Sequence, residues 1–134
     1  MNIFYLFIIV FFYSQSLFAG GERCLEPTSQ REMNYCAEIE LESILKKFEL
    51  QSQKISSAFL KSKIEGANEL FEKSITHSRQ YVESHCESAS QIYHGGSLHH
   101  YAGIQCKVNL YRKLITINNG DYKDTLNILD SGAP

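Results

Sequence analysis

The sequence predicts an all-α fold, a small antiparallel bundle of three main helices held together by two disulfides. From residue 29 to residue 117 the apolar side chains recur every three or four positions, which is the spacing of one helix face. The alternating apolar and polar pattern typical of strands is absent from the sequence. Four cysteines follow an apolar leader, and an even number of cysteines in a small exported domain is typical of a disulfide framework.

Residues 1–19 have the composition of a secretory signal peptide. They contain no Lys, Arg, Asp or Glu, and residues 3–13 are almost all apolar or aromatic. Such a segment suits the apolar region of a signal peptide and is short for a membrane span. Ala19 supplies a small residue for cleavage. We therefore expect a mature chain that begins near Gly20 and is periplasmic or secreted, without insertion into a membrane.

Two alternatives for the leader are an uncleaved anchor and a lipoprotein. An anchor is disfavoured because neither a positive cluster nor a stop-transfer pattern follows the apolar stretch. A lipid-bearing cysteine should directly follow the small residues at the cleavage point. Cys24 is instead preceded by Gly21, Glu22 and Arg23, so cleavage by the ordinary export route is the favoured interpretation.

The first expected helix spans residues 30–58. Ser29 and Glu32 have the spacing of a capping box, in which each of two side chains satisfies a backbone N–H at the start of a helix. Charged residues such as Glu38, Glu42 and Lys46 lie between the apolar positions and are expected to face solvent. The apolar stripe that should face the core consists of Ala37, Leu41, Ile44, Phe48, Ile55 and Phe59.

The second expected helix spans residues 63–87 and begins at another capping-box pair, Ser62 and Glu65. The short link makes it an antiparallel neighbour of the first helix. The third expected helix spans residues 98–117, with Ser97 as its N-cap. Apolar stripes mark both helices, with Ile64, Ala67, Phe71, Ile75, Ser78 and Val82 in the second and Tyr101, Ile104, Val108, Tyr111 and Ile115 in the third.

Turn-forming residues set the boundaries of the helical domain. Residues 88–96 are expected to form a loop because they are rich in Ser, Gln and His and end in two glycines. The run Asn118-Asn119-Gly120-Asp121 is a strong breaker that should end the third helix, so the helical domain covers residues 20–121. Residues 122–134 are expected to form a loose or only briefly helical tail, with one apolar group at Leu126, Ile128 and Leu129.

The expected topology gathers the four cysteines toward one end of the bundle, beside the loop. Cys24 lies in the segment that enters the first helix, and Cys36 lies near the start of that helix. Cys86 ends the second helix, and Cys106 lies in the early turns of the third. Four cysteines allow three pairings, and the sequence leaves all three open. We favour Cys36–Cys86, which would tie the first hairpin, together with Cys24–Cys106, which would fasten the entry segment to the third helix.

Composition and motifs argue against several function classes. The chain has a formal net charge of −2 and no basic patch, so neither nucleic acid nor an anionic membrane surface is expected as a partner. The sequence contains no phosphate-binding loop, dinucleotide glycine pattern or zinc-protease motif. Its carboxylates lie along amphipathic helices, where solvent reaches them. We therefore expect no enzymatic activity and no cofactor.

Five histidines raise a metal hypothesis, because imidazole binds zinc, copper and nickel. Their spacing is not diagnostic of a ligand set, and thiolates in disulfides cannot contribute. Surface histidines without a metal are therefore the favoured interpretation for His77, His85, His94, His99 and His100.

Residues 28–37 (TSQREMNYCA), with Cys24 before them, resemble the opening of the LprI-type lysozyme-inhibitor N-terminal domain family, which is found in exported bacterial proteins. The later order of Tyr81, Cys86, the two glycines with Ser97, and Cys106 is also similar to that family. The resemblance covers residues 24–118. The chain differs where the family usually has Trp, Arg, Thr and Arg, since it carries Ser78, Val82, Tyr111 and Leu114 at those positions.

The resemblance implies an exported binding protein that inhibits a lysozyme or another cell-wall hydrolase, with that protein as its partner. The alternative is an exported structural or interaction protein with an unrelated envelope or host partner. An inhibitor should expose a protruding polar or aromatic loop near a rigid end, whereas a structural module should leave an extended apolar face on a helix. For an inhibitor we expect contact through residues 93–100, where Tyr93, His94, Ser97 and His99 offer donors and a flat ring beside two glycines.

Overall fold

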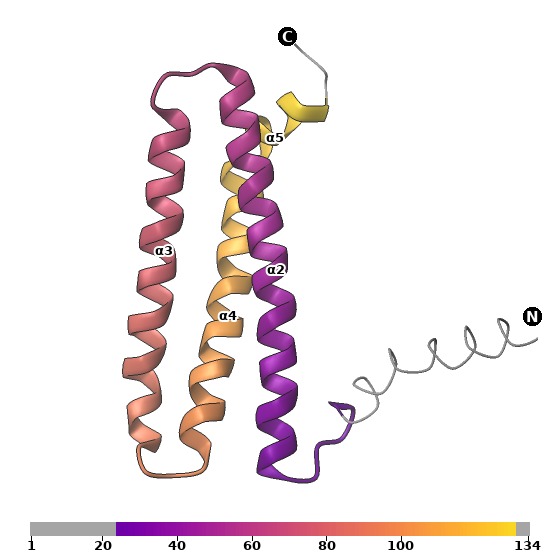
Figure 1. Cartoon of the computed structure of the whole chain (residues 1–134), viewed down its shortest axis with the longest axis vertical. Helices are drawn as coiled ribbons and strands as arrows, with labels where there is room; N and C mark the ends of the chain where they lie inside the picture. Colours follow the sequence, from indigo (N-terminus) through magenta and orange to yellow (C-terminus); the bar gives the residue numbers. More distant parts are fainter. Residues whose placement is uncertain (1–23, 131–134) are drawn as a thin grey trace, which may run out of the picture.

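The computed structural model describes residues 24–130, and the signal peptide expected at residues 1–19 lies outside them. In this range the chain forms α2 (Gln30–Ser62), α3 (Ala67–Ser90), a short 3₁₀ helix η2 (Gln91–Tyr93), α4 (Leu98–Asp121) and α5 (Lys123–Asp130), and no strand is present among these residues. The long helices α2, α3 and α4 run alternately up and down, and the short α5 lies at one end (Figure 1). The predicted all-α fold with three main helices and two disulfides is confirmed.

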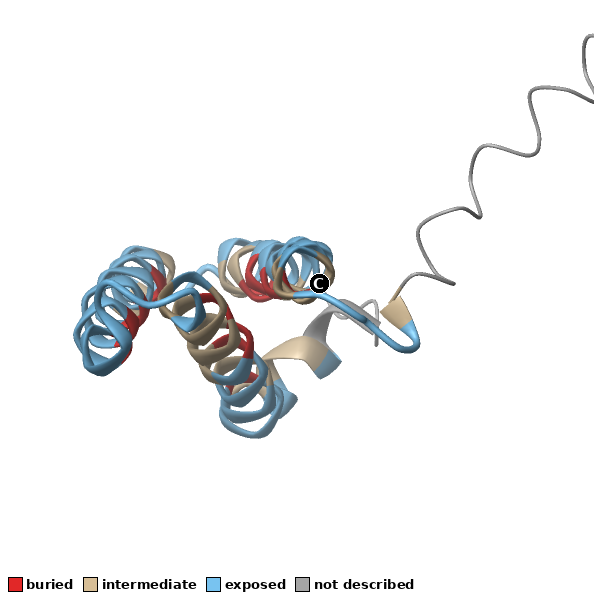
Figure 2. Cartoon of the chain, turned by 90° about the horizontal axis from the view of Figure 1, so that it is seen from below, coloured by how far each residue is buried: buried red, intermediate tan, exposed pale blue. Residues whose placement is uncertain are grey.

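The third helix in the chain, α4, lies between α2 and α3. It packs against both of them, and α2 and α3 are directly connected at the end of the bundle opposite the α3–α4 loop (Figure 1). Seen from below, the buried residues of each helix face the neighbouring helix (Figure 2). The bundle is therefore arranged around α4 instead of around an α2–α3 hairpin.

The apolar stripes of the sequence form the core. The residues with the lowest exposure come from all three long helices, and almost all of them are stripe positions: Ala37, Ile44, Phe48, Ile55, Phe71, Ile75, Val82, Ile104, Val108 and Tyr111. Ile64 is an exception, since 59% of its surface is exposed. It lies in the α2–α3 connection, outside both helices, because α3 begins at Ala67.

The beginning of α2 agrees with the capping-box prediction, whereas the beginning of α3 does not. At the start of α2 the Glu32 backbone N–H donates to Ser29 Oγ at 3.2 Å, and Glu32 Oε2 accepts from the backbone N–H of Thr28 at 2.8 Å. Ser62 is the last residue of α2, and its Oγ donates to the Phe59 carbonyl at 2.8 Å. Lys63 follows with a left-handed φ of 54°, a conformation that ends a helix. The Ser62–Glu65 pair therefore marks a helix end, and the predicted helix start at residue 63 is wrong.

The expected breaker at residues 118–120 does not end α4, which continues to Asp121. The side chain of Asn118 is buried, and Asn119 Oδ1 accepts from Gln51 Nε2 at 2.6 Å. The same Gln51 nitrogen donates to the Ile115 carbonyl at 2.9 Å. These contacts with α2 stabilise another turn of α4 although the local sequence favours a stop.

The segment after α4 is helical through residue 130, which agrees with the briefly helical form among the two expected for residues 122–134. Residues 123–130 form the brief helix α5, which packs on α2, and Leu126 contacts the core. The Tyr122 ring lies edge-on to Phe59 and Phe71, with ring centroids 5.8 and 5.1 Å away. Each such aromatic pair contributes about 0.5–1.5 kcal/mol beyond its burial. Residues 131–134 lie outside the described part of the chain.

Among residues 24–130, no helix has the length and apolar character needed to cross a membrane.

Candidate functional site

The disulfides join Cys24 to Cys36 and Cys86 to Cys106, with Cα–Cα distances of 5.5 Å in both pairs. The favoured pairing of Cys36 with Cys86 and Cys24 with Cys106 is therefore wrong. It assumed that the start of α2 packs directly on the end of α3, but α4 lies between the two helices at this end (Figure 1). Cys86 faces α4 and Cys36 faces the entry segment. Both disulfides nevertheless lie in the half of the bundle that carries the α3–α4 loop, as expected.

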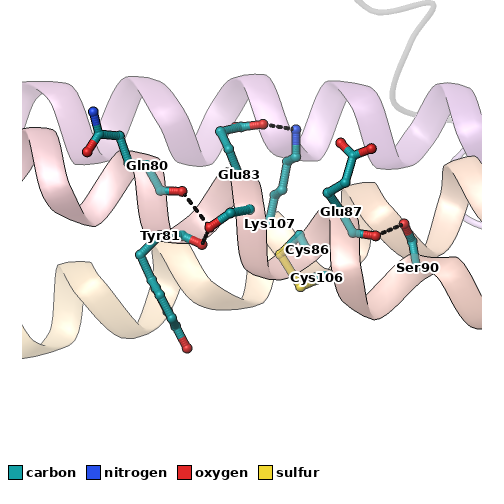
Figure 3. A network of polar contacts seen from close by, with 9 residues as sticks. Gln80, Tyr81, Glu83, Cys86, Glu87, Ser90, Cys106 and Lys107 are labelled. Atoms are coloured by element: carbon teal, nitrogen blue, oxygen red, sulfur yellow. Dashed lines mark hydrogen bonds and ion pairs between the residues drawn. A yellow bond between two sulfur atoms is a disulfide. The ribbon is translucent and has the colours of Figure 1, made fainter.

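The seam between α3 and α4 is fastened immediately behind this loop. Lys107 of α4 forms an ion pair with Glu83 of α3 beside the Cys86–Cys106 disulfide (Figure 3). One turn further on, the buried Ser90 donates its hydroxyl hydrogen to the Glu87 carbonyl at 3.0 Å. A covalent bond and an ion pair thus hold the two helices in register where they approach the loop.

We call residues 91–99 the tip, which comprises η2, the turn and the first two residues of α4. Backbone hydrogen bonds within the tip determine its shape. The His94 N–H donates to the Gln91 carbonyl and the Gly96 N–H to the Tyr93 carbonyl, both at 2.9 Å. The His99 N–H donates to the Gly96 carbonyl at 3.3 Å. Gly95 has a φ of 76°, a conformation that residues with a Cβ rarely adopt, so the tip requires a glycine here.

The four predicted contact residues all lie in the tip, and three of them are exposed. Tyr93, His94 and Ser97 are open to solvent, whereas His99 is half-buried. The rings of His94 and His99 meet edge to face with centroids 5.8 Å apart, and His99 Nε2 lies 3.3 Å from Ser90 Oγ. Ser97 precedes α4 as expected, but its side chain makes no capping hydrogen bond because its own backbone is already helical.

Two apolar members of the tip were missed by the sequence reasoning. Ile92 is 79% exposed and Leu98 is 43% exposed, and both are close in the chain to Tyr93, which is 41% exposed. Neither residue belongs to an apolar stripe. Ile92 lies in a polar loop and does not continue the spacing of the core-facing residues. This feature of the sequence could have indicated an exposed apolar contact residue.

Besides the tip, the bundle has a concave surface between α2 and α4. It is an open groove of about 750 Å³, bordered at one end by the entry segment with Cys24 and Pro27. Tyr101 and Met33 supply apolar lining, and Arg112 of α4 forms an ion pair with Glu40 of α2 within the groove. The groove therefore contains an aromatic ring and an ion pair whose two charges compensate each other.

The charged and titratable groups of the described residues bear on whether the chain has a metal site that uses three or more protein ligands. In residues 24–130, no group of three or more His, Cys, Asp or Glu side chains is placed to hold a metal ion. The pKa of the Tyr111 phenol is raised by burial and further by Glu83, while Arg79 opposes the increase. Tyr111 packs on Phe48 in the core, with ring centroids 5.1 Å apart, so its raised pKa reflects packing between the helices.

No family model, curated protein or solved structure matches this chain. Inferences about function therefore depend on the residues of the tip and the groove.

Proposed function

We propose that this chain is an exported binding protein whose tip enters the substrate cleft of a lysozyme or another cell-wall hydrolase and blocks it. The observation that supports this function is the cluster of exposed Ile92, Tyr93 and Leu98 on a loop with its own backbone hydrogen bonds. Large apolar side chains gathered at one exposed place mark interaction sites more often than the same residues scattered singly. Aromatic anchors of this kind contribute much of the binding energy in protein interfaces.

The chemistry of the tip suits a glycosidase cleft. Such a cleft holds two carboxyl groups, one protonated and one charged, in a groove shaped for a sugar polymer. The exposed Tyr93 offers a flat ring to the surface on which sugars stack, and His94 and Ser97 offer hydrogen-bond donors to carboxylates. The left-handed Gly95 and its neighbour Gly96 keep the turn narrow, which allows its backbone to approach the walls of the cleft.

The order of the tip before binding also favours tight association. Each side chain that is immobilised on binding costs about 0.5–1.5 kcal/mol, and flexible backbone costs more. Here the backbone is already held by three hydrogen bonds and by the Cys86–Cys106 disulfide behind them. The resemblance to the LprI-type family agrees with the same partner class.

A second candidate function is an exported structural or interaction protein with an unrelated envelope or host partner. The α2–α4 groove favours it, because an open groove of about 750 Å³ with one aromatic ring in its lining offers a concave surface to a partner. The two candidates use different faces of the bundle, so substitutions can separate them.

The test is a turbidity assay of lysozyme on bacterial cell walls, with the disulfide-bonded mature protein as inhibitor. The double variant Tyr93→Ala/His94→Ala removes the exposed ring and donor but leaves the half-buried His99 in place. We expect inhibition to weaken about tenfold or more, which corresponds to about 1.4 kcal/mol. The matched control is Tyr81→Ala/His85→Ala, which removes an exposed tyrosine and a histidine in ring contact on α3, outside the tip.

Three results decide between the candidates. Loss of inhibition in the tip variant alone supports the proposed contact. Equal inhibition by both variants and the parent protein would place the contact outside the tip, and Tyr101→Ala in the groove would then be the informative change. If the parent protein inhibits neither lysozyme nor other cell-wall hydrolases, the proposed function is wrong.

A further inference from the structure

The fold brings together two histidines that are five positions apart in the sequence. His94 follows η2, His99 lies in the first turn of α4, and their rings meet edge to face with centroids 5.8 Å apart. Two imidazoles that bind one tetrahedral zinc ion, through nitrogens at about 2.0–2.1 Å, have ring centres roughly 5 Å apart. The exposed His94 ring can close this small difference by rotating. We propose that His94 and His99 bind a divalent transition metal ion, with Zn²⁺ as the reference case.

Ser90 determines which nitrogen of the His99 imidazole is free to bind a metal ion. The Ser90 hydroxyl has one hydrogen and donates it to the Glu87 carbonyl at 3.0 Å. At its 3.3 Å contact with His99 Nε2, the Ser90 oxygen can therefore act only as an acceptor. Nε2 must then carry the imidazole hydrogen, which leaves the lone pair on Nδ1. A buried acceptor that fixes the tautomer of a histidine is the usual second partner of a metal-binding imidazole.

The charged groups in the hollow beside His99 are compatible with a bound cation. Glu87 and Lys107 line the same small hollow as His99, which has a volume of about 170 Å³. The ammonium group of Lys107 is already paired with Glu83. His100, the next residue, points toward α2, where its Nε2 lies 2.8 Å from Glu38 Oε1. The lysine in this hollow is therefore already paired with a carboxylate, which reduces its repulsion of a cation at His99.

The site offers two protein ligands, so water would complete the coordination shell. The ring contact between His94 and His99 and the backbone bonds of the tip keep the two imidazoles together before a metal arrives. This pre-ordering distinguishes them from His77 and His85, which lie eight residues apart on α3, with His85 stacked on Tyr81 at a centroid distance of 5.2 Å. His94 also belongs to the proposed hydrolase contact, but zinc binding is measured without that partner, so either proposal can fail while the other holds.

The experiment is a calorimetric titration of the tag-free, disulfide-bonded mature chain with Zn²⁺. We expect one zinc ion per chain, and His94→Ala should weaken the affinity about tenfold or more. Ser90→Ala should also weaken it, by about tenfold, because the tautomer of His99 is no longer fixed. The matched control His77→Ala/His85→Ala removes two exposed histidines from α3 and should bind zinc like the parent chain. Circular dichroism of each variant verifies that the helices are intact.

A second measurement does not depend on any variant. Two-bond ¹H–¹⁵N spectra of the parent chain identify the tautomer of each histidine and the nitrogen that binds zinc. We expect His99 to carry its hydrogen on Nε2 before zinc is added and to bind zinc through Nδ1. Absence of stoichiometric zinc binding, equal affinity of the parent chain and His94→Ala, or coordination by His77 or His85 would each overturn the proposal.

Discussion

The two disulfides join very different parts of the bundle, and their removal should have different consequences. Cys86–Cys106 links two helices of the core, and Cys86 has no exposed surface. Cys24–Cys36 links α2 to the entry segment, whose residues 25–29 are all exposed. The double variants Cys86→Ala/Cys106→Ala and Cys24→Ala/Cys36→Ala remove one bond each and leave no unpaired thiol in the chain.

The sequence separations are 20 and 12, so loop-closure entropy alone assigns about 3.3 and 2.8 kcal/mol to the two bonds. These values assume that both ends stay fixed in the native state. That assumption holds for Cys86–Cys106, because α3 packs on α4 and α4 packs on α2. Loss of the sulfur atoms from the core adds roughly 1 kcal/mol. The assumption fails for Cys24–Cys36, because the entry segment also gains freedom in the folded chain. We expect a loss of about 4 kcal/mol for the first variant and about 1 kcal/mol or less for the second.

Urea unfolding followed by circular dichroism measures both losses. Since small domains have a total stability of about 5–15 kcal/mol, the first loss should lower the midpoint of unfolding greatly. The slope of the transition should increase modestly, because the unfolded chain without the bond is less compact and exposes more surface. Equal losses in the two variants, or a larger loss for Cys24→Ala/Cys36→Ala, would refute the argument that the entry segment is peripheral to the core.

Three further predictions concern the covalent structure, the core and the pH dependence. Trypsin digestion without reduction should release residues 80–107 as one peptide with an internal disulfide, whereas a Cys36–Cys86 bond would link that peptide to residues 32–46. Ile55→Ala should destabilise the fold by about 2–5 kcal/mol in urea unfolding because the side chain is fully buried, and Leu45→Ala, at an exposed position of α2, should have a much smaller effect. Burial raises the pKa of Tyr111 above its ordinary value of 10.0, so the unfolded chain loses this proton at lower pH than the folded chain does. The free energy of unfolding is therefore intact below pH 10 and should fall as the pH rises toward the folded pKa. Tyr111→Phe should remove this part of the pH dependence of stability.

Helix periodicity predicted the core because burial itself imposes the period. Phe48, Ile55, Val82 and Val108 were assigned to core stripes from spacing alone, and each is almost completely buried. Helix ends were less predictable, because local signals compete with contacts made elsewhere in the chain. Residues 118–120 favour a helix end, but α4 continues because Gln51 of α2 donates hydrogen bonds to the Ile115 carbonyl and to Asn119. A local sequence pattern cannot predict a contact with a distant helix.

The disulfide pairing could not be deduced because it depends on which helices are neighbours. With three helices that run alternately up and down, α4 could pack on the outside of the α2–α3 hairpin or between its two helices. The spacing of cysteines and apolar residues along the chain is the same in both arrangements. The position of the tip was predictable from its two glycines and the flanking helices. Its apolar residues and the contact between His94 and His99 were not, because they depend on the conformation of the turn.

The distribution of exposed apolar side chains bears on the two candidate functions. On the long helices most such residues occur singly, as at Leu60 and Leu70, and isolated exposed apolar residues are normal in soluble domains. Tyr35 and Ile39 form one pair a single turn apart on α2, which does not extend over several turns. A continuous apolar face, expected of a structural module that packs along a helix, would require such residues to repeat every three or four positions over several turns. In the tip, Ile92 and Tyr93 are adjacent and precede the turn at Gly95 and Gly96. The concentration of exposed apolar surface where the chain reverses therefore favours recognition through the tip over packing along a helix.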